Sequence, residues 1–306
     1  MKKVRKAVIP AAGFGTRFLP ATKAQPKEML PIVDKPVIQY VVEECVASGI
    51  TDIIIVTGWH KRSIEDHFDY PYELETRLKL AGKTKQLEEI RDIGSMANFI
   101  YIRQKGPYGT ATPVHNAKNI IGDEPFAVIW GDEFIHANPP RMKQCIEVYE
   151  EFGCPVISGV KIEKKEDLSK YGIADVSPVR ERIYTLKGLV EKPKPQDAPS
   201  DIATIGCYIL PPEIFGIIEN LKPSKDGEYI LAGAIDILAK QMPIYIREIE
   251  NAKYYDCGDK LSYIIANLDF AMKRPDLAPG LREYMEKILH SSLEAEKARS
   301  SDKIVK

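Results

Sequence analysis

The sequence has few cysteines and no long apolar run. Its five cysteines (Cys45, Cys145, Cys154, Cys207 and Cys257) are scattered and form no CxxC pair, which argues against disulfides or a structural zinc site and indicates reduced thiols. No apolar stretch approaches the roughly 20 residues that cross a bilayer, and the start MKKVRKAVIPAAG lacks the apolar core and cleavage site of a signal peptide. We therefore expect a cytoplasmic protein without membrane contact.

The sequence also lacks a charge bias. Its 306 residues carry a formal net charge of −1, with 28% charged and 44% hydrophobic residues. This is the composition of an ordinary globular protein and argues against a general nucleic-acid binder. The length allows one large α/β unit or two small domains. We expect partners that are small molecules.

The N-terminal half alternates apolar strands, glycine turns and helical segments. Val4–Ala11 is apolar and β-branched, apolar residues then recur at helical spacing from 37 to 46, and Asp52–Gly58 has the continuous apolar pattern of a strand buried on both faces. Glu124–Asp132 and Pro155–Val160 repeat the strand pattern. These features predict a doubly wound α/β fold with a parallel sheet.

The remaining segments are predicted from their polarity and turn residues. Asp69–Ser95 is charged and favours an exposed helical excursion. After Tyr171, short alternating strands are expected at 171–176, 186–193 and 203–210, with a proline-rich surface loop at 192–200. Leu261–Met272 is predicted as an amphipathic helix, and Leu293–Lys306 is a charged tail that is either helical or disordered.

The run PAAGFGTRFLPATKAQPKEMLP, from Pro10 to Pro31, follows the first predicted strand and contains a glycine loop. The dinucleotide motif GxGxxG is not met, because Phe18 occupies the third glycine position, and the Walker motif is not met, because Thr16 and Arg17 follow Gly15. A nicotinamide dehydrogenase or a P-loop ATPase is thereby disfavoured. Gly13 and Gly15 alone predict only a tight turn, but cations clustered beside them favour phosphate binding; these cations are Arg17, Lys23 and Lys27.

Several motifs together resemble one family, the sugar-1-phosphate nucleotidylyltransferases. They are GFGTR (13–17), LPATK (19–23), PKEMLP (26–31), DKP (34–36), GD (131–132), EKP (191–193) and YDCG (255–258). The chain resembles in particular the bacterial UTP:glucose-1-phosphate uridylyltransferases, to about Met272. The resemblance implies a Rossmann-like nucleotidyltransferase fold with a mostly parallel mixed central sheet and a smaller sugar-binding lobe. It divides the chain into a catalytic domain, 1–275, and a C-terminal helical region and charged tail, 276–306, with nucleotide binding mainly in 1–160 and sugar binding mainly in 161–260.

The reaction that the resemblance implies is attack by a sugar-1-phosphate oxygen on the α-phosphorus of UTP, with release of pyrophosphate. The matching positions assign Arg17, Lys27 and Lys192 as catalytic residues, and Asp132 and Asp256 as ligands of Mg²⁺. Glucose 1-phosphate would be bound by Gly172, Glu191 and Lys192. The nucleotide would be bound by Ala11, Ala12, Gly13, Gly15, Thr16, Glu28, Gln104 and Gly109.

Two departures from the family pattern leave alternatives open. Glu133 stands where the uridylyltransferases usually have a second aspartate, and Pro107–Pro113 replaces their usual glycine-rich continuation. UTP therefore competes with dTTP as the nucleotide, because the two bases differ by one methyl group, and another hexose 1-phosphate is a further alternative. A catalytically silent nucleotide-sugar sensor remains the rival from another class. The family's habit favours a homo-oligomer, either a dimer or a tetramer.

Overall fold

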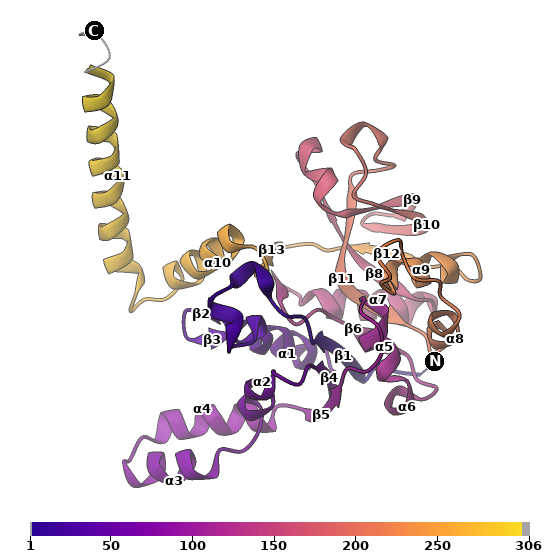
Figure 1. The fold of residues 1–306 in the computed structure, drawn as a ribbon, viewed down its shortest axis with the longest axis horizontal. Coiled ribbons are helices and arrows are strands. Elements are labelled where there is room, and N and C mark those ends of the chain that lie inside the picture. The colour runs from indigo at the N-terminus through magenta and orange to yellow at the C-terminus, as the bar shows by residue number, and fades with distance from the viewer. Residues whose placement is uncertain (1, 302–306) are drawn as a thin grey trace.

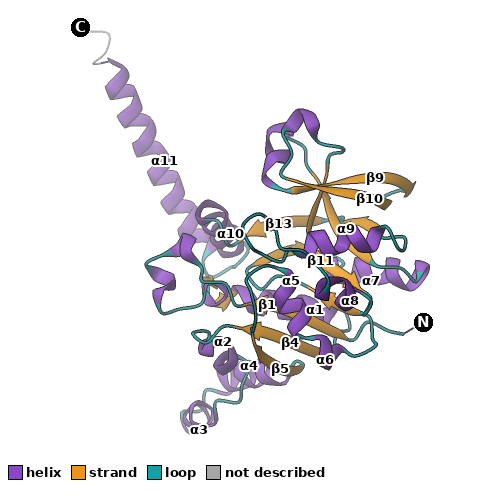
Figure 2. Ribbon diagram, turned by 45° about the vertical axis from the view of Figure 1, so that its right-hand side comes forward, coloured by secondary structure: helices purple, strands orange, loops and turns teal. Residues whose placement is uncertain are grey.

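The computed structural model describes residues 2–301. Within these residues, nine strands form one mixed sheet in the order β5-β4-β1-β6-β11-β8-β12-β10-β9, with helices on both faces (Figures 1 and 2). Two small sheets, β13–β7 and β2–β3, stand beside it. The predicted α/β fold with a mixed central sheet is confirmed. Parallel pairing joins β5-β4-β1-β6 and β8-β12, whereas the other strand pairs of the sheet are antiparallel, so the sheet is less parallel than expected.

The bounds of the elements follow. The strands are β1 (Lys6–Ala11), β2 (Pro31–Ile32), β3 (Lys35–Pro36), β4 (Asp52–Thr57), β5 (Asn98–Arg103), β6 (Phe126–Val128), β7 (Glu133–Ala137), β8 (Val156–Lys161), β9 (Gly172–Arg180), β10 (Ile183–Glu191), β11 (Ile202–Leu210), β12 (Tyr245–Glu248) and β13 (Ala252–Asp256). The helices are α1 (Val37–Ala47), α2 (Arg62–His67), α3 (Tyr72–Leu80), α4 (Thr84–Ser95), α5 (Ala111–Asn116), α6 (Lys118–Ile121), α7 (Arg141–Phe152), α8 (Ile214–Glu219), α9 (Leu231–Ala239), α10 (Lys260–Met272) and α11 (Ala278–Ser301).

Strand β1 occupies an interior position in the sheet because both of its faces are apolar. Ala7 and Ile9 pack into the core cluster on one side, and Val8 packs into the cluster on the other. The strand pairs in parallel with β4 and β6, and β4 pairs in parallel with β5. The carboxyl ends of four strands therefore meet at one edge, which is where α/β folds bind their ligands.

The two faces of the sheet are covered by different helices. On one face, helix α7 packs on β8 and β11 and contacts α1. On the other face, helix α5 packs on β1 and β4 and contacts α8, and α8 contacts α9. In α7 the apolar residues face inward and Gly153 ends the helix in the left-handed conformation, with φ of 67°. Both faces of the central strands are thus buried, as the apolar runs predict.

The second half of the chain shares this sheet. Strand β11 pairs antiparallel with both β6 and β8. A strand from the part predicted for sugar binding is therefore hydrogen-bonded to a strand from the part predicted for nucleotide binding. Strands β9 and β10 form a long antiparallel hairpin at the end of the sheet. The two predicted parts of the catalytic region are thus joined by continuous strand pairing.

One predicted segment is shorter in the structure, and two predicted helical segments are confirmed. The expected strand 124–132 is only Phe126–Val128, because the ladder with β11 ends there, although Ile129 and Gly131 still donate backbone hydrogen bonds to β1. The excursion 69–95 is a pair of helices, α3 and α4, that extends from the body (Figure 1). Helix α11 projects from the body separately, at the upper left of Figure 1, and includes the predicted tail as far as Ser301, whereas 302–306 lie outside the described residues.

Candidate active site

The glycine loop follows β1 and turns sharply at Gly15. Gly15 has φ of 66°, and its carbonyl accepts a hydrogen bond of 2.7 Å from the buried hydroxyl of Thr22. A Cβ atom at Gly15 would lie 3.2 Å from side-chain carbons of Thr22 and Lys27. Glycine is therefore required both for the left-handed backbone and for close contact with the PKEMLP segment.

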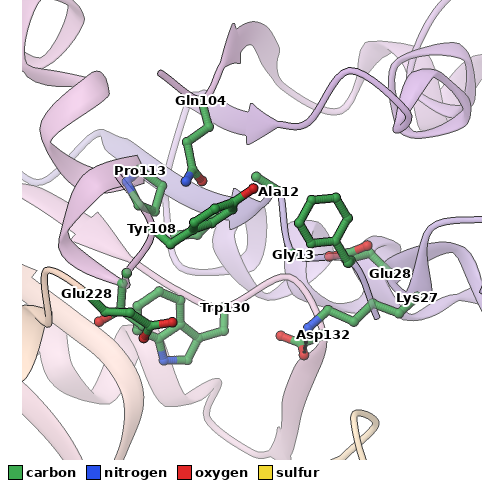
Figure 3. Close-up of a pocket in the computed structure, with 14 residues that line it drawn as sticks. Ala12, Gly13, Lys27, Glu28, Gln104, Tyr108, Pro113, Trp130, Asp132 and Glu228 are labelled. Atoms are coloured by element: carbon green, nitrogen blue, oxygen red, sulfur yellow. Dashed lines mark hydrogen bonds and ion pairs between the residues drawn. The ribbon is translucent and has the colours of Figure 1, made fainter. Parts of the chain in front are cut away.

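A cavity of about 430 Å³ opens beside this loop at the carboxyl edge of the parallel strands (Figure 3). Figure 3 shows Gln104 and Tyr108 on one side of the cavity and Lys27 and Asp132 on the other, and Gly109 also lines it. The predicted residues that line it are Ala12, Gly13, Lys27, Glu28, Gln104, Gly109 and Asp132. The cavity thus brings together residues from the beginning of the chain and residues more than 100 positions later.

Lys27 and Asp132 form an ion pair inside this cavity. Lys27 Nζ lies 2.5 Å from Asp132 Oδ2, and both side chains are about four-fifths buried. Burial acts to lower the pKa of Lys27, but the negative charges of Asp132 and Glu28 outweigh it, so that the pKa is raised. Lys27 therefore stays cationic beside any phosphate that enters the cavity.

A second ion pair is buried beneath the cavity. Lys61 Nζ donates to Glu28 Oε2 at 2.6 Å, and each side chain is only 1% exposed. Burial raises the pKa of Glu28 and lowers that of Lys61, and each shift is offset in part by the charge of the partner. Glu28 is predicted to bind nucleotide, but its carboxylate is paired with the buried ammonium of Lys61.

Arg17 and Asp256 meet around Gly258. A Cβ at Gly258 would lie 2.7 Å from Arg17 Nη2 and 3.0 Å from Asp256 Oδ1, so glycine leaves the room that the two side chains share. The Gly258 N–H also donates to Asp256 Oδ1 at 2.8 Å. Arg17 is exposed and lies outside the lining of the 430 Å³ cavity.

The two predicted metal ligands are brought close by the ribbon β7–β13. Asp256 pairs directly with Glu133, the residue after Asp132, and directly paired residues have Cα atoms about 5 Å apart. Among the described residues, no three His, Cys, Asp or Glu side chains form a metal site. Mg²⁺, however, is usually bound through one or two carboxylates together with substrate phosphates, and this donor pair fits that requirement.

The predicted sugar-phosphate residues form a separate cluster at the end of the β9–β10 hairpin. Gly172 pairs with Glu191, and a Cβ at Gly172 would lie 3.2 Å from Glu191 Oε2. Lys192 has a positive φ of 45°, and its Nζ lies 3.7 Å from Glu191 Oε1. Tyr171, which precedes Gly172, contacts the ring of Tyr254, two residues before Asp256. The cluster is therefore connected to the ribbon that carries Asp256.

The remaining predicted residues support the loop. Ala11 is buried at the end of β1, and Gly15 and Thr16 begin the short 3-10 helix Thr16–Phe18 that carries Arg17. Ala11, Gly15 and Thr16 do not line the cavity. They hold the loop in place at the end of β1.

Several cavity residues are absent from the sequence prediction. Phe14, Tyr108, Trp130 and Glu228 line the cavity, and the rings of Phe14 and Tyr108 lie 6.1 Å apart. The unusual segment 107–113 already marks Tyr108 as a departure, but no sequence pattern indicates Glu228. The Glu228 segment reaches the cavity because the Tyr229 N–H donates to the Tyr108 carbonyl at 3.0 Å.

Comparisons with known proteins agree with this geometry. The profile of the nucleotidyl transferase family matches residues 6–273. The chain belongs to this family. It is 49% identical over 288 residues to the UTP–glucose-1-phosphate uridylyltransferase YngB of Bacillus subtilis (strain 168), covering 94% of this chain and 96% of that protein. A second uridylyltransferase of the same strain is 49% identical over 290 residues, covering 95% and 99%.

Solved structures give the same result. A UTP-bound UGPase from Acinetobacter baumannii superposes with a TM-score of 0.85 at 36% identity, covering 92% of this chain and 98% of that one. A UDP-glucose pyrophosphorylase complexed with UDP-glucose gives 0.80 at 41% identity, covering 89% and 100%. The family resemblance drawn from the motifs is therefore confirmed.

Proposed function

We propose that the protein is a Mg²⁺-dependent UTP:glucose-1-phosphate uridylyltransferase. The observation that carries the proposal is the cavity that is lined by Lys27, Asp132, Gln104 and Gly109 together. The cavity therefore contains the ammonium of Lys27, which can bind phosphate, and the carboxylate of Asp132. It also contains the amide of Gln104, which can hydrogen-bond the edge of a pyrimidine. The uridylyltransferases of Bacillus subtilis support the choice of UTP and glucose 1-phosphate.

The reaction forms one bond and breaks another. An oxygen of glucose 1-phosphate attacks the α-phosphorus of UTP, the bond from that phosphorus to the bridging oxygen breaks, and pyrophosphate leaves with the electron pair. Lys27 and Arg17 stabilise the negative charge on the triphosphate. Lys192 brings the anionic sugar phosphate close, and Glu191 accepts hydrogen bonds from sugar hydroxyls. Mg²⁺, held by Asp132 and Asp256, would neutralise phosphate charge.

The test is a coupled assay of pyrophosphate release. We expect release with UTP and glucose 1-phosphate, and much slower release when dTTP or another hexose 1-phosphate is substituted. Arg17→Ala should lower kcat/KM by about 10²-fold or more. Arg62→Ala is the matched control, because Arg62 is 83% exposed in a surface pair with Asp66. Binding of UTP without turnover by the wild-type protein would contradict the proposal.

We also infer a homo-oligomer that works in the cytoplasm. Large apolar side chains are exposed on α10 and α11; these are Leu261, Ile264, Tyr284, Ile288 and Leu289. Such an exposed apolar surface favours association with a second copy. All five cysteines are free thiols, in agreement with a reducing compartment. Light scattering after size-exclusion chromatography tests the association, and a monomer at micromolar concentration would refute it.

A further inference from the structure

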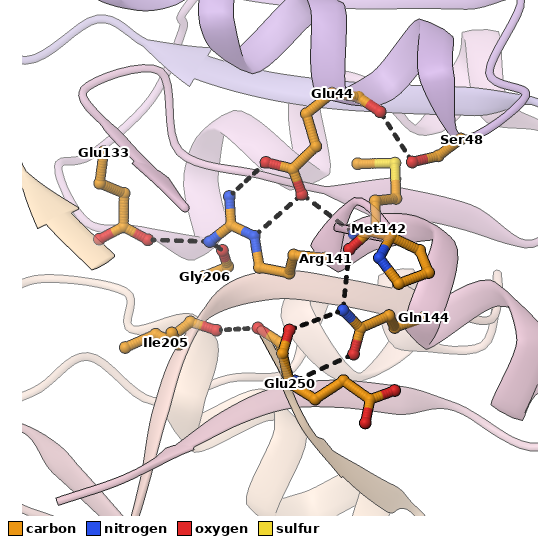
Figure 4. Close-up of polar contacts among 11 residues, drawn as sticks. Glu44, Ser48, Glu133, Arg141, Met142, Gln144, Ile205, Gly206 and Glu250 are labelled. Atoms are coloured by element: carbon orange, nitrogen blue, oxygen red, sulfur yellow. Dashed lines mark hydrogen bonds and ion pairs between the residues drawn. The ribbon is translucent and has the colours of Figure 1, made fainter. Parts of the chain in front are cut away.

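Glu133, the residue after Asp132 and the strand partner of Asp256, belongs to a buried polar network. Figure 4 shows its carboxylate beside the guanidinium of Arg141. Tyr254 donates its hydroxyl to Glu133 Oε2 at 2.8 Å. Glu133 Oε1 is buried without a hydrogen-bond partner among the described residues and lies 3.8 Å from Arg141 Nη1. Glu133 is thus attached to strand β13 by a hydrogen bond and to helix α7 by charge.

Arg141 is itself fixed from two sides. Its Nε and Nη2 donate to the two carboxylate oxygens of Glu44 on α1, each at 3.1 Å, and its side chain is fully buried. Nη1 donates to the carbonyl of Gly206 on β11 (Figure 4). A forked pair of this kind fixes the guanidinium in one orientation. Arg141 therefore presents its third nitrogen to Glu133 from a rigid position.

The network acts on the ribbon that carries the metal ligands. Glu133 pairs directly with Asp256 in the β7–β13 register, and directly paired residues project from the same face. Tyr254 and Asp256 are two residues apart on β13, so they also share a face. The hydrogen bond from Tyr254 to Glu133 is thus a diagonal link across the strand pair, beside Asp256 and one residue from Asp132.

The contacts of Glu133 with Tyr254 and Arg141 depend on the length of the side chain at position 133. An aspartate there would be shorter by one carbon–carbon bond, about 1.5 Å. Its carboxylate would recede from both the Tyr254 hydroxyl and the Arg141 guanidinium. The glutamate that departs from the family pattern is therefore matched to partners on two other elements.

We propose that Glu133 is a positioning residue which, held by Tyr254 and Arg141, fixes the β7–β13 ribbon so that Asp132 and Asp256 face the same Mg²⁺. The inference rests on the proposed Mg²⁺-dependent reaction. It assigns to Glu133 no contact with substrate or metal. It predicts that loosening the network weakens binding of the Mg²⁺ complex of UTP selectively.

The experiment is calorimetric titration of UTP into the whole protein, once with Mg²⁺ and once with a chelator. Tyr254→Phe should weaken binding of MgUTP about fivefold while leaving binding of metal-free UTP unchanged. Tyr255→Phe is the matched control, because its hydroxyl bonds Asp269 instead, at 3.0 Å. A general structural defect would weaken both forms of UTP equally, and that result would overturn the proposal, as would unchanged MgUTP binding.

A second variant keeps the test decisive. Glu133→Asp should show the same selective loss and should raise the Mg²⁺ concentration for half-maximal pyrophosphate release at least fivefold. If Tyr254→Phe does not fold, equal loss of both UTP forms in Glu133→Asp contradicts the positioning role. If the wild-type protein forms no UDP-glucose with Mg²⁺, the proposed function fails instead. The two failures are thus distinguished by the wild-type assay.

Discussion

The buried pair of Lys61 and Glu28 gives a sharp stability prediction. Both side chains are 1% exposed and their charged atoms are 2.6 Å apart. Lys61→Met would leave the Glu28 carboxylate in the interior without its hydrogen-bond donor, and breaking a buried pair in this way costs about 3–5 kcal/mol. Lys27 also stabilises the Glu28 charge, so we expect the lower value, about 3 kcal/mol.

The assay is urea unfolding followed by circular dichroism, with thermal melting as a second measure. A loss of about 3 kcal/mol corresponds to a drop in Tm of roughly 6–12 °C for a domain of about this size. The double variant Lys61→Met, Glu28→Leu should recover most of this loss, because it also removes the carboxylate that the single variant leaves buried without a partner.

An exposed ion pair supplies the control for this prediction. Arg77 Nη2 and Glu73 Oε1 are 2.9 Å apart, but the side chains are 75% and 81% exposed. Arg77→Met should therefore change stability by less than about 0.5 kcal/mol. A cost below 1 kcal/mol for Lys61→Met, or a double variant as unstable as the single one, would refute the reasoning.

Three further predictions concern the cavity and its surroundings. Gly109→Ala should raise the KM for UTP at least about tenfold. Gly109 has φ of 129°, and a Cβ atom there would lie 2.2 Å from the Tyr229 carbonyl oxygen. The control is Gly82→Ala, because nothing lies within 4 Å of a Cβ at Gly82. Tyr108→Ala should raise the same KM between about fivefold and a hundredfold if its ring stacks on the base, since such stacking contributes about 1–3 kcal/mol; an unchanged KM would exclude stacking. Burial, partly opposed by a neighbouring arginine, raises the pKa of Glu133 from 4.5 to about 7. The metal-free protein should therefore lose up to about 3 kcal/mol of stability as pH rises from 4.5 through 7, and Glu133→Gln should flatten that dependence in urea titrations at several pH values.

The strands and the glycine loop could be predicted because their causes are local. β1 and β4 are continuous apolar runs, and Gly15 stands where the backbone is left-handed. The insertion of β11 between β6 and β8 could not be predicted, because it depends on pairing between segments about 40 to 80 residues apart. Sequence pattern specifies which residues form a strand, but not which strand lies beside it.

The candidate site divides in the same way. Short motifs single out Lys27 and Asp132, and the structure places the two in contact. No motif marks Lys61 or Arg141, because an isolated cation in a sequence resembles any surface charge. Only the tertiary fold shows that Arg141 is fully buried. Residues that contact the site residues without lining the cavity cannot be identified from a sequence motif.

In the proposed reaction, Asp132 and Asp256 hold one catalytic cation. The most direct measurement is kcat/KM for pyrophosphate release by Asp132→Asn, Asp256→Asn and the double variant, with Mg²⁺ saturating for the wild type. If both side chains bind one ion, each single variant should lose at least about 10²-fold, and the double variant should be little worse than the weaker single one. Losses that multiply, or a single loss below tenfold, would contradict the shared cation.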